Sequence, residues 1–123
     1  MVIREDQMAA LAESRAADFE RDVIAHLRSS FPDWCAGSSD GALLEFVRYG
    51  MARARAHGMR AARDVCTYVD LMVLLGRDFE GDPQITWAGE RLCDVRRYTD
   101  PSARIEQLWS EACERHGRPE TGQ

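Results

Sequence analysis

The sequence contains no lysine, little glycine or proline, and no long hydrophobic run. All 16 basic residues are arginine, which indicates a GC-rich coding bias and by itself predicts no chemistry. With 9 glycines and 4 prolines in 123 residues, the composition argues against disorder and against a loop-rich β architecture. The longest apolar run of note, Leu71 to Leu75, is far too short to cross a bilayer. We therefore expect a soluble protein with no membrane among its partners.

Signals for export and for disulfide bonds are also missing. The first residues carry charges and lack the apolar stretch of a signal peptide, which predicts a cytoplasmic protein. The four cysteines are far apart and form no CxxC pair, so we expect reduced thiols that are mostly buried as small hydrophobic side chains. They are Cys35, Cys66, Cys93 and Cys113.

The chain is acidic, with a formal net charge of −5 at pH 7. Binding to nucleic acid begins with the neutralisation of phosphates by basic side chains, so this balance disfavours DNA and RNA as general partners. A local basic patch is still compatible with it. We expect no nucleic acid among the partners.

What the sequence does contain is helical periodicity. Apolar residues recur every three or four positions in several segments, and one segment is apolar on nearly every side. A chain of this length with 45% hydrophobic residues can bury a real core. We expect an all-α fold, a single compact domain over residues 1–116 with about five helices around a central apolar helix at about 61–75. Residues 117–123 are expected to be a frayed tail.

Capping residues predict where these helices begin and end. A first helix begins near Arg4 and is stopped by Pro32. Ser39 or Asp40 caps a second helix, which ends at Gly58. The central helix ends at Gly76 and lacks a capping side chain at its start.

Two Asp-Pro pairs predict the starts of the remaining helices. In Asp82-Pro83 and again in Asp100-Pro101, an N-cap residue precedes a proline at the first helical position. The first of these helices is expected to carry the apolar residues Ile85, Trp87, Ala88, Leu92 and Val95. In the second, Glu111 and Arg115 are spaced to pair along the helix.

No residue pattern marks a catalytic centre. The histidines, His26, His57 and His116, stand beside no recognisable nucleophile pattern, and the sequence has no glycine-rich elbow or phosphate loop. We therefore expect no enzyme, no catalytic residue and no cofactor.

Two arrangements suggest a metal site, and neither meets its requirements. Asp78, Glu80 and Asp82 alternate as at the start of a calcium loop, but the glycine and the glutamate that complete such a loop are missing. Cys113 and His116 have the spacing of two zinc ligands, but no matching second pair exists. We expect no metal.

An arginine cluster and two aromatic residues are the candidate partner-binding residues. The arginines lie around the turn between the second and third helices, either as a solvated edge or as a docking surface for an acidic partner, since guanidinium groups bind carboxylates well. The aromatic residues near the exit of the central helix either cap the core or leave one ring exposed as an interface anchor. The candidates are Arg48, Arg53, Arg55, Arg60, Arg63, Phe79 and Trp87.

The middle of the chain also carries a pattern of residues that resembles a known group of proteins. It reads Gly50, Arg53-Ala54, Gly58, Asp64-Val65, Tyr68, Leu71-Met72, Leu75-Gly76, Phe79, Asp82-Pro83 and Trp87-Ala88. This resembles a group of small uncharacterised bacterial all-helical proteins encoded beside type VI secretion spike (PAAR-type) and effector genes. The similarity covers roughly residues 15 to 95, and its most telling part runs from Tyr68 to Trp87.

The resemblance implies a non-enzymatic accessory role and transfers no catalytic residue. An adaptor or chaperone-like partner of a type VI secretion effector or spike protein is the expected function, because a helical domain can present an amphipathic face without any chemistry. The first alternative is an immunity protein that neutralises a cognate toxin. The second is a small transcriptional regulator, although the third helix is too apolar to lie in a DNA groove.

Overall fold

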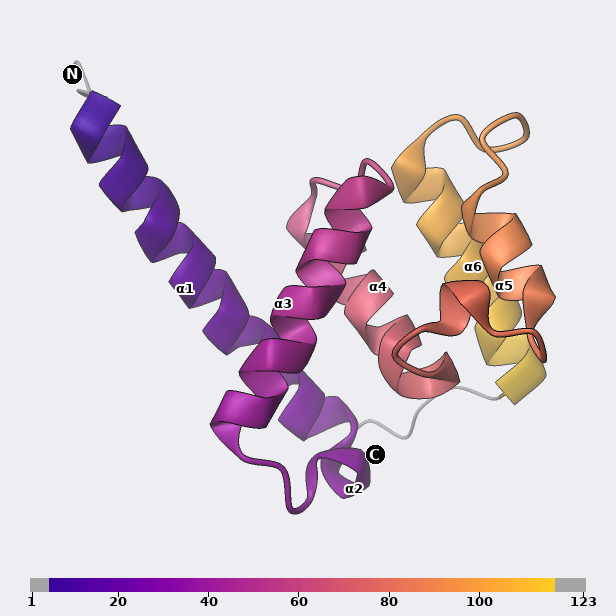
Figure 1. Cartoon of the computed structure of the whole chain (residues 1–123), viewed down its shortest axis with the longest axis horizontal. Coiled ribbons are helices and arrows are strands. Elements are labelled where there is room, and N and C mark those ends of the chain that lie inside the picture. The colour runs from indigo at the N-terminus through magenta and orange to yellow at the C-terminus, as the bar shows by residue number, and fades with distance from the viewer. Residues whose placement is uncertain (1–4, 117–123) are drawn as a thin grey trace.

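The computed structural model describes residues 5–116, with side chains described from Ala17 to Arg115; the predicted tail at 117–123 lies outside these residues. Within residues 5–116 the chain forms six α-helices and a 3-10 turn, and no strand, which confirms the all-α class (Figure 1). Between these bounds, no helix is both long and apolar enough to cross a membrane. The elements are α1 (Glu5–Ser30), α2 (Pro32–Cys35), α3 (Asp40–Ala56), α4 (Ala62–Leu75), η1 (Phe79–Gly81), α5 (Thr86–Leu92) and α6 (Pro101–His116).

Helix α4 is the centre of the fold, as predicted for residues 61–75. It packs against α3 on one side and α6 on the other, and it also contacts α1 (Figure 1). Tyr68, Val69, Leu71 and Met72 are almost fully buried along it. Because α4 is apolar around most of its circumference, it is stable only where other helices cover it on several sides.

Only the second half of helix α1 packs against the other helices. Its second half lies against α2, α3 and α4, where Val23 and Leu27 enter the core and Phe19 is partly buried. Its first half extends away from the other helices (Figure 1). The packed half therefore fixes the direction in which the whole helix points.

A glycine allows α3 and α4 to approach closely. Gly50 is buried at their crossing, and a Cβ atom there would lie 2.8 Å from both Met72 Sδ and Val69 Cγ2. Only a residue without a side chain fits this contact. The crossing places the C-terminal half of α3 beside the segment that follows α4.

The predicted ends of the helices are largely confirmed. The Ser39 hydroxyl accepts the Ala42 N–H at the start of α3, and α3 ends two residues before Gly58, whose φ is +83°. Gly76 ends α4 with a φ of +116°. Positive φ is accessible to glycine without steric cost, which explains both stops. Asp100 precedes α6 and its carboxylate accepts the Ser102 N–H, as an N-cap does.

The short helix α2 was not predicted. Pro32 ends α1, yet it also opens a single helical turn in which the Cys35 N–H donates to the Phe31 carbonyl. Proline is tolerated at the first position of a helix because no internal partner is required for its missing N–H. The same residue can therefore stop one helix and begin the next.

The predicted helix start at Asp82-Pro83 is wrong, because α5 begins at Thr86. The Asp82 carbonyl accepts the Ile85 N–H, and its carboxylate accepts the Gln84 N–H, so Asp82 and Pro83 open a β-turn instead. Aspartate followed by proline is equally favoured in such a turn. Helix α5 is also shorter than expected. Leu92 lies on α5 as predicted and is buried, but Ile85 precedes the helix, and Val95 lies beyond its end and is exposed.

The start of α4 lacks a capping side chain, as predicted, and one tertiary contact holds its first turn. Asp64 in the first turn is buried and accepts a hydrogen bond from the Ser102 hydroxyl of α6. A carboxylate in the first turn also suits the positive end of the helix dipole. The first turn of α4 is thus tied to α6 by a side-chain contact, although no side chain caps its backbone N–H groups.

Candidate functional site

The five predicted arginines do not form a single patch. Arg48 binds Glu20 of α1, with 2.6 Å between Nε and Oε2. Arg63 binds Glu106 of α6, with 2.6 Å between Nη2 and Oε1. These two salt bridges reach different neighbouring helices, so the two arginines face different parts of the surface.

The other three arginines also separate. Arg55 and Arg60 are exposed, on α3 and on the loop that follows it. Arg53 turns toward η1 and binds Glu80, with 2.9 Å between Nη2 and Oε2. The arginines are thus distributed over several faces, and only single members can belong to any one site.

Glu80 is the centre of a largely buried polar network. Its carboxylate, 15% exposed, accepts hydrogen bonds from Arg53 and His57 of the α3 end and from Tyr68 of α4. Burial by itself raises the pKa of Glu80, but the hydrogen bonds from His57, Tyr68 and Arg53 outweigh it and lower the pKa to about 2. The carboxylate is ionised at neutral pH and joins η1 to α3 and α4.

The pKa of Tyr68 shifts in the opposite direction to that of Glu80. Burial raises the pKa of its hydroxyl far above the ordinary value, and the hydrogen bond to Glu80 raises it further. Tyr68 therefore keeps its proton and acts as a hydrogen-bond donor. This network is suited to holding elements together, since each of its groups already has a partner.

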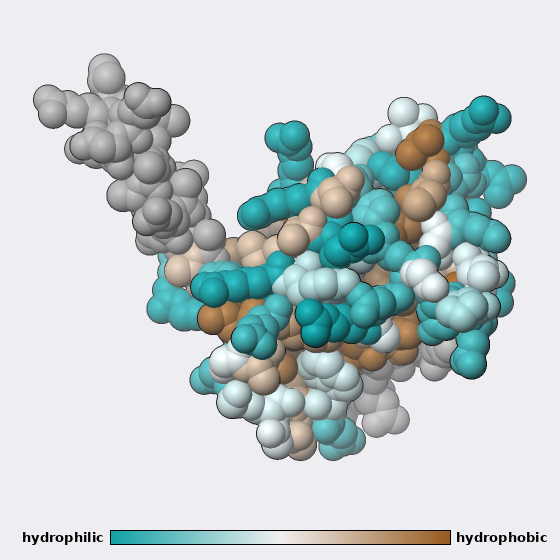
Figure 2. Space-filling model, in the orientation of Figure 1, coloured by the Kyte–Doolittle hydropathy of each residue, from teal (hydrophilic) through white to brown (hydrophobic). Residues whose placement is uncertain are grey.

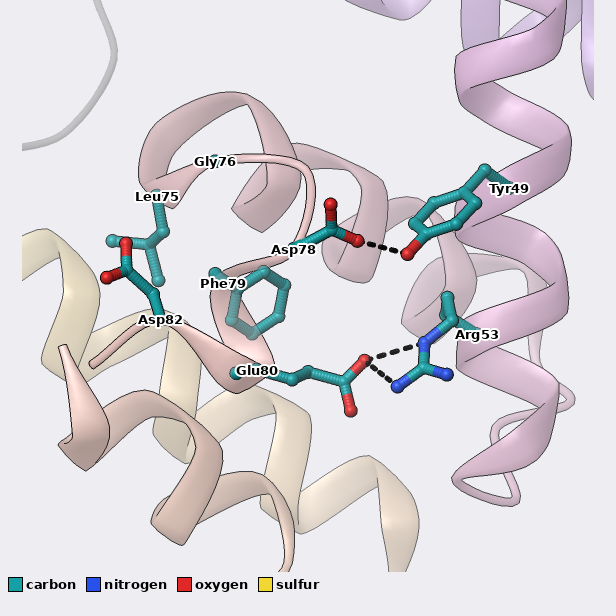
Figure 3. A pocket seen from close by; sticks show the side chains of 9 residues that line it. Tyr49, Arg53, Leu75, Gly76, Asp78, Phe79, Glu80 and Asp82 are labelled. Carbon is teal, nitrogen blue, oxygen red and sulfur yellow. Dashed lines mark hydrogen bonds and ion pairs between the residues drawn. The ribbon is translucent and has the colours of Figure 1, made fainter. Parts of the chain in front are cut away.

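A cleft of about 540 Å³ opens beside this network (Figure 3). On one wall, the Tyr49 hydroxyl donates to the Asp78 carboxylate, and the Arg77 guanidinium lies 4.2 Å from the centre of the Tyr49 ring. The polar side chains along the cleft are thus largely paired with one another. The lining residues are Tyr49, Arg53, Leu75, Gly76, Asp78, Phe79, Glu80, Gly81 and Asp82.

The three alternating carboxylates near η1 do not converge on a point. Asp78 is directed to Tyr49, Glu80 to Arg53, and Asp82 points away from both (Figure 3). The arrangement expected of calcium ligands is therefore not formed by this segment. Cys113 and His116 have the spacing of two zinc ligands, but the side chain of His116 lies outside the described residues.

The two aromatic candidates differ in accessibility. Phe79 is 1% exposed and its ring centre lies 5.3 Å from that of Tyr68, so it belongs to the core and offers no surface to a partner. Trp87 is half-buried on α5, and the Arg115 guanidinium lies 4.4 Å from the centre of its ring. Of the two interpretations made from the sequence, capping of the core fits Phe79.

A second groove, of about 560 Å³, lies between α1 and α3. Its apolar side chains are those of Ala17 and Ile24 on α1 and Leu44 on α3. Charged side chains of both signs surround them, and Arg48 is the one predicted arginine among them. The lining residues are Ala17, Glu20, Arg21, Ile24, Asp40, Gly41, Leu44 and Arg48.

Figure 2 shows the hydropathy of this face of the molecule. Hydrophilic residues dominate the surface over α3, and hydrophobic residues are seen mainly in recesses between them. Leu44 is half-buried in the groove and is not part of the main core. An apolar floor with charges along both sides is the surface expected where an amphipathic segment binds.

Sequence reasoning missed Leu44, Ile24 and one exposed aromatic residue. Trp34 of α2 is 40% exposed and its ring lies against Phe46 of α3, with 4.7 Å between ring centres. Leu44 and Ile24 each follow a core residue directly, so both lie on the flank of an apolar stripe. Such a position in the sequence can identify apolar residues at the edge of a helix's buried face. It cannot show which two helices bring these edges together.

No family model, no curated protein and no solved structure matches this chain. Its function is therefore inferred from the geometry above and from the resemblance in the sequence.

Proposed function

We propose that the chain is a non-enzymatic protein-binding accessory factor, an adaptor or chaperone-like partner of a type VI secretion effector or spike protein. The observation that carries the binding role is the groove between α1 and α3, with Leu44 and Ile24 at its floor. The connection to secretion is supported by the resemblance of the segment from Tyr68 to Trp87.

The occupant that we propose is an amphipathic helix of the effector or spike protein. Arg21 and Arg48 border the groove together with Glu20 and Asp40, so a helix with charges of both signs beside an apolar stripe complements it. Such a helix packed along α1 and α3 covers Leu44 with apolar side chains. The backbone of α1 continues past the groove (Figure 1).

The experiment is an affinity capture from the native cell, followed by measured binding to the effector or spike protein that is found. Leu44→Glu introduces a charge into the groove and should weaken binding at least about tenfold, or about 1.4 kcal/mol. Val95→Glu is the matched control, because Val95 is exposed beyond α5, on another part of the molecule. It should leave the affinity unchanged.

The result also separates the adaptor from its alternatives. An adaptor binds the full-length effector or spike protein and leaves the toxin active, whereas an immunity protein binds the toxic domain and abolishes its activity. A regulator binds DNA in a salt-dependent manner. Capture of no secretion component, or equal binding by Leu44→Glu and wild type, contradicts the proposal.

A further inference from the structure

Two pairs of polar side chains meet where α1 packs against α4. His26 and Ser30 are four residues apart on α1, and Cys66 and Asp70 are four residues apart on α4, so each pair lies on one face of its helix. His26 Nε2 lies 2.9 Å from Asp70 Oδ1 and 3.0 Å from Oδ2. The donor atoms of His26, Cys66 and Asp70 all lie within 4.8 Å of one another.

These three side chains offer a nitrogen, a sulfur and an oxygen to one point. Zinc binds such mixed sets, with distances of about 2.0–2.3 Å, so the ligand atoms of a tetrahedral site are roughly 3.3–3.8 Å apart. Because the donor atoms of His26, Cys66 and Asp70 lie within 4.8 Å of one another, no pair has to close by more than about 1.5 Å to reach that spacing. Facing helices are a common framework for metal sites.

The surroundings of His26 fit a zinc ligand. Its second ring nitrogen, Nδ1, lies 3.3 Å from the hydroxyl of the buried Ser30, a contact that holds Nε2 toward α4. Histidine ligands usually have such a partner on the ring nitrogen that does not bind the metal. The His26 side chain is 37% exposed and that of Asp70 is 14% exposed, so one side of the cluster is open to water.

We propose that His26, Cys66 and Asp70 bind a zinc ion, with a water molecule as the fourth ligand on the open side. The thiol proton of Cys66 is released to solvent, and the ion replaces the hydrogen bond between His26 and Asp70. One thiolate and one carboxylate balance the two positive charges, so the partly buried site is neutral. The ion links α1 to α4, and the proposal is independent of the partner-binding role.

The test uses the untagged full chain. Zinc binding is measured in competition with a chromophoric chelator, and cobalt(II) is used in a separate experiment as a spectroscopic probe. Wild type should bind one equivalent of zinc, and its cobalt form should show the sulfur-to-metal charge-transfer band of a thiolate ligand. Cys66→Ser should abolish that band and weaken binding at least about 100-fold, and Ser30→Ala should weaken it about tenfold. Cys93→Ser is the matched control, because Cys93 is an exposed cysteine outside the cluster.

Each outcome is decisive. Zinc that raises the melting temperature of wild type and of Cys93→Ser, but not of Cys66→Ser, supports the site, because a ligand of the folded state stabilises it by mass action. Absence of zinc binding leaves only a histidine–aspartate pair and overturns the proposal. Zinc binding that is unchanged in Cys66→Ser overturns it as well.

Discussion

Gly89 of α5 lies directly against the backbone of Glu80, so that a Cβ atom at position 89 would overlap the Glu80 carbonyl oxygen. The approach presses α5 onto η1, the element that carries the Glu80 carboxylate. The backbone of Glu80 is thus held by α5 while its side chain binds α3 and α4. Glu80 therefore connects α5 with α3 and α4.

The contact predicts the effect of adding one methyl group. Gly89→Ala forces α5 away from η1 and should lower the free energy of unfolding by about 1–3 kcal/mol. Gly41→Ala is the matched control, because Gly41 lies in the first turn of α3 and a Cβ atom there would meet only the Ser39 hydroxyl, at 3.8 Å. It should be neutral or stabilising by up to about 1 kcal/mol. Urea unfolding measures both, and equal stability of the two variants would contradict the packing described.

Glu80 should give the protein a specific acid sensitivity. Its pKa is about 2 in the folded state and 4.5 ordinarily, so the unfolded chain takes up its proton first as the pH falls. The stabilisation by Glu80 is complete above about pH 4.5 and is lost as the pH falls toward 2. Glu80→Gln should be less stable at pH 7 by about 1–3 kcal/mol, and this deficit should shrink over that window.

The measurement is urea unfolding of both proteins from pH 7 down to pH 2. Glu106→Gln is the control, because Glu106 pairs with Arg63 on an exposed surface. It should change stability by no more than about 0.5 kcal/mol. A deficit of Glu80→Gln that stays constant with pH would show that the carboxylate is not stabilised in the way described.

The contact between Ser102 and Asp64 ties the first turn of α4 to α6. Ser102→Ala removes the hydroxyl donor and leaves a buried carboxylate with one fewer partner, which should cost about 1–3 kcal/mol of stability. Ser110→Ala, an exposed change on the same helix, should cost no more than about 0.5 kcal/mol. Thermal unfolding followed by circular dichroism compares the two, and similar melting temperatures would refute the role of Ser102.

Arg104 is buried on α6 and binds the ends of two other helices. Its guanidinium donates to the Leu92 carbonyl at the end of α5 and to the His57 carbonyl at the end of α3. Arg104→Met leaves both carbonyls without this donor and should destabilise the fold by about 1.5–3 kcal/mol. Arg96→Met, at an exposed arginine, should stay within about 0.5 kcal/mol. Equal urea midpoints for these two variants would rule out the capping role.

The helices could be predicted because their signals are local. Ser39 caps α3 and Gly58 and Gly76 end helices through contacts within a few residues, so the sequence contains the whole cause. The prediction of a helix start at Asp82-Pro83 was wrong because the same dipeptide can open either a helix or a β-turn. Which of the two forms depends on the surrounding structure. At Asp100-Pro101 the dipeptide does open a helix, α6.

The sites could not be predicted, because they depend on how helices are rotated and paired. Arg48 and Arg53 are near in sequence, but five residues turn an α-helix by about 140° beyond a full turn, so they face different neighbours. His26 and Asp70 are separated by 44 positions and meet only because α1 lies on α4. No periodicity within one segment can reveal such a pair.

The position of Arg104 has a consequence for how the molecule comes apart. A single side chain that holds the ends of α3 and α5 makes those helices dependent on α6, although His57 at the end of α3 is 47 residues from Arg104. If α6 detaches, both ends lose their donor at the same moment. These helices are therefore expected to melt in one cooperative transition, with no stage at which α5 or α6 has left and the rest is intact.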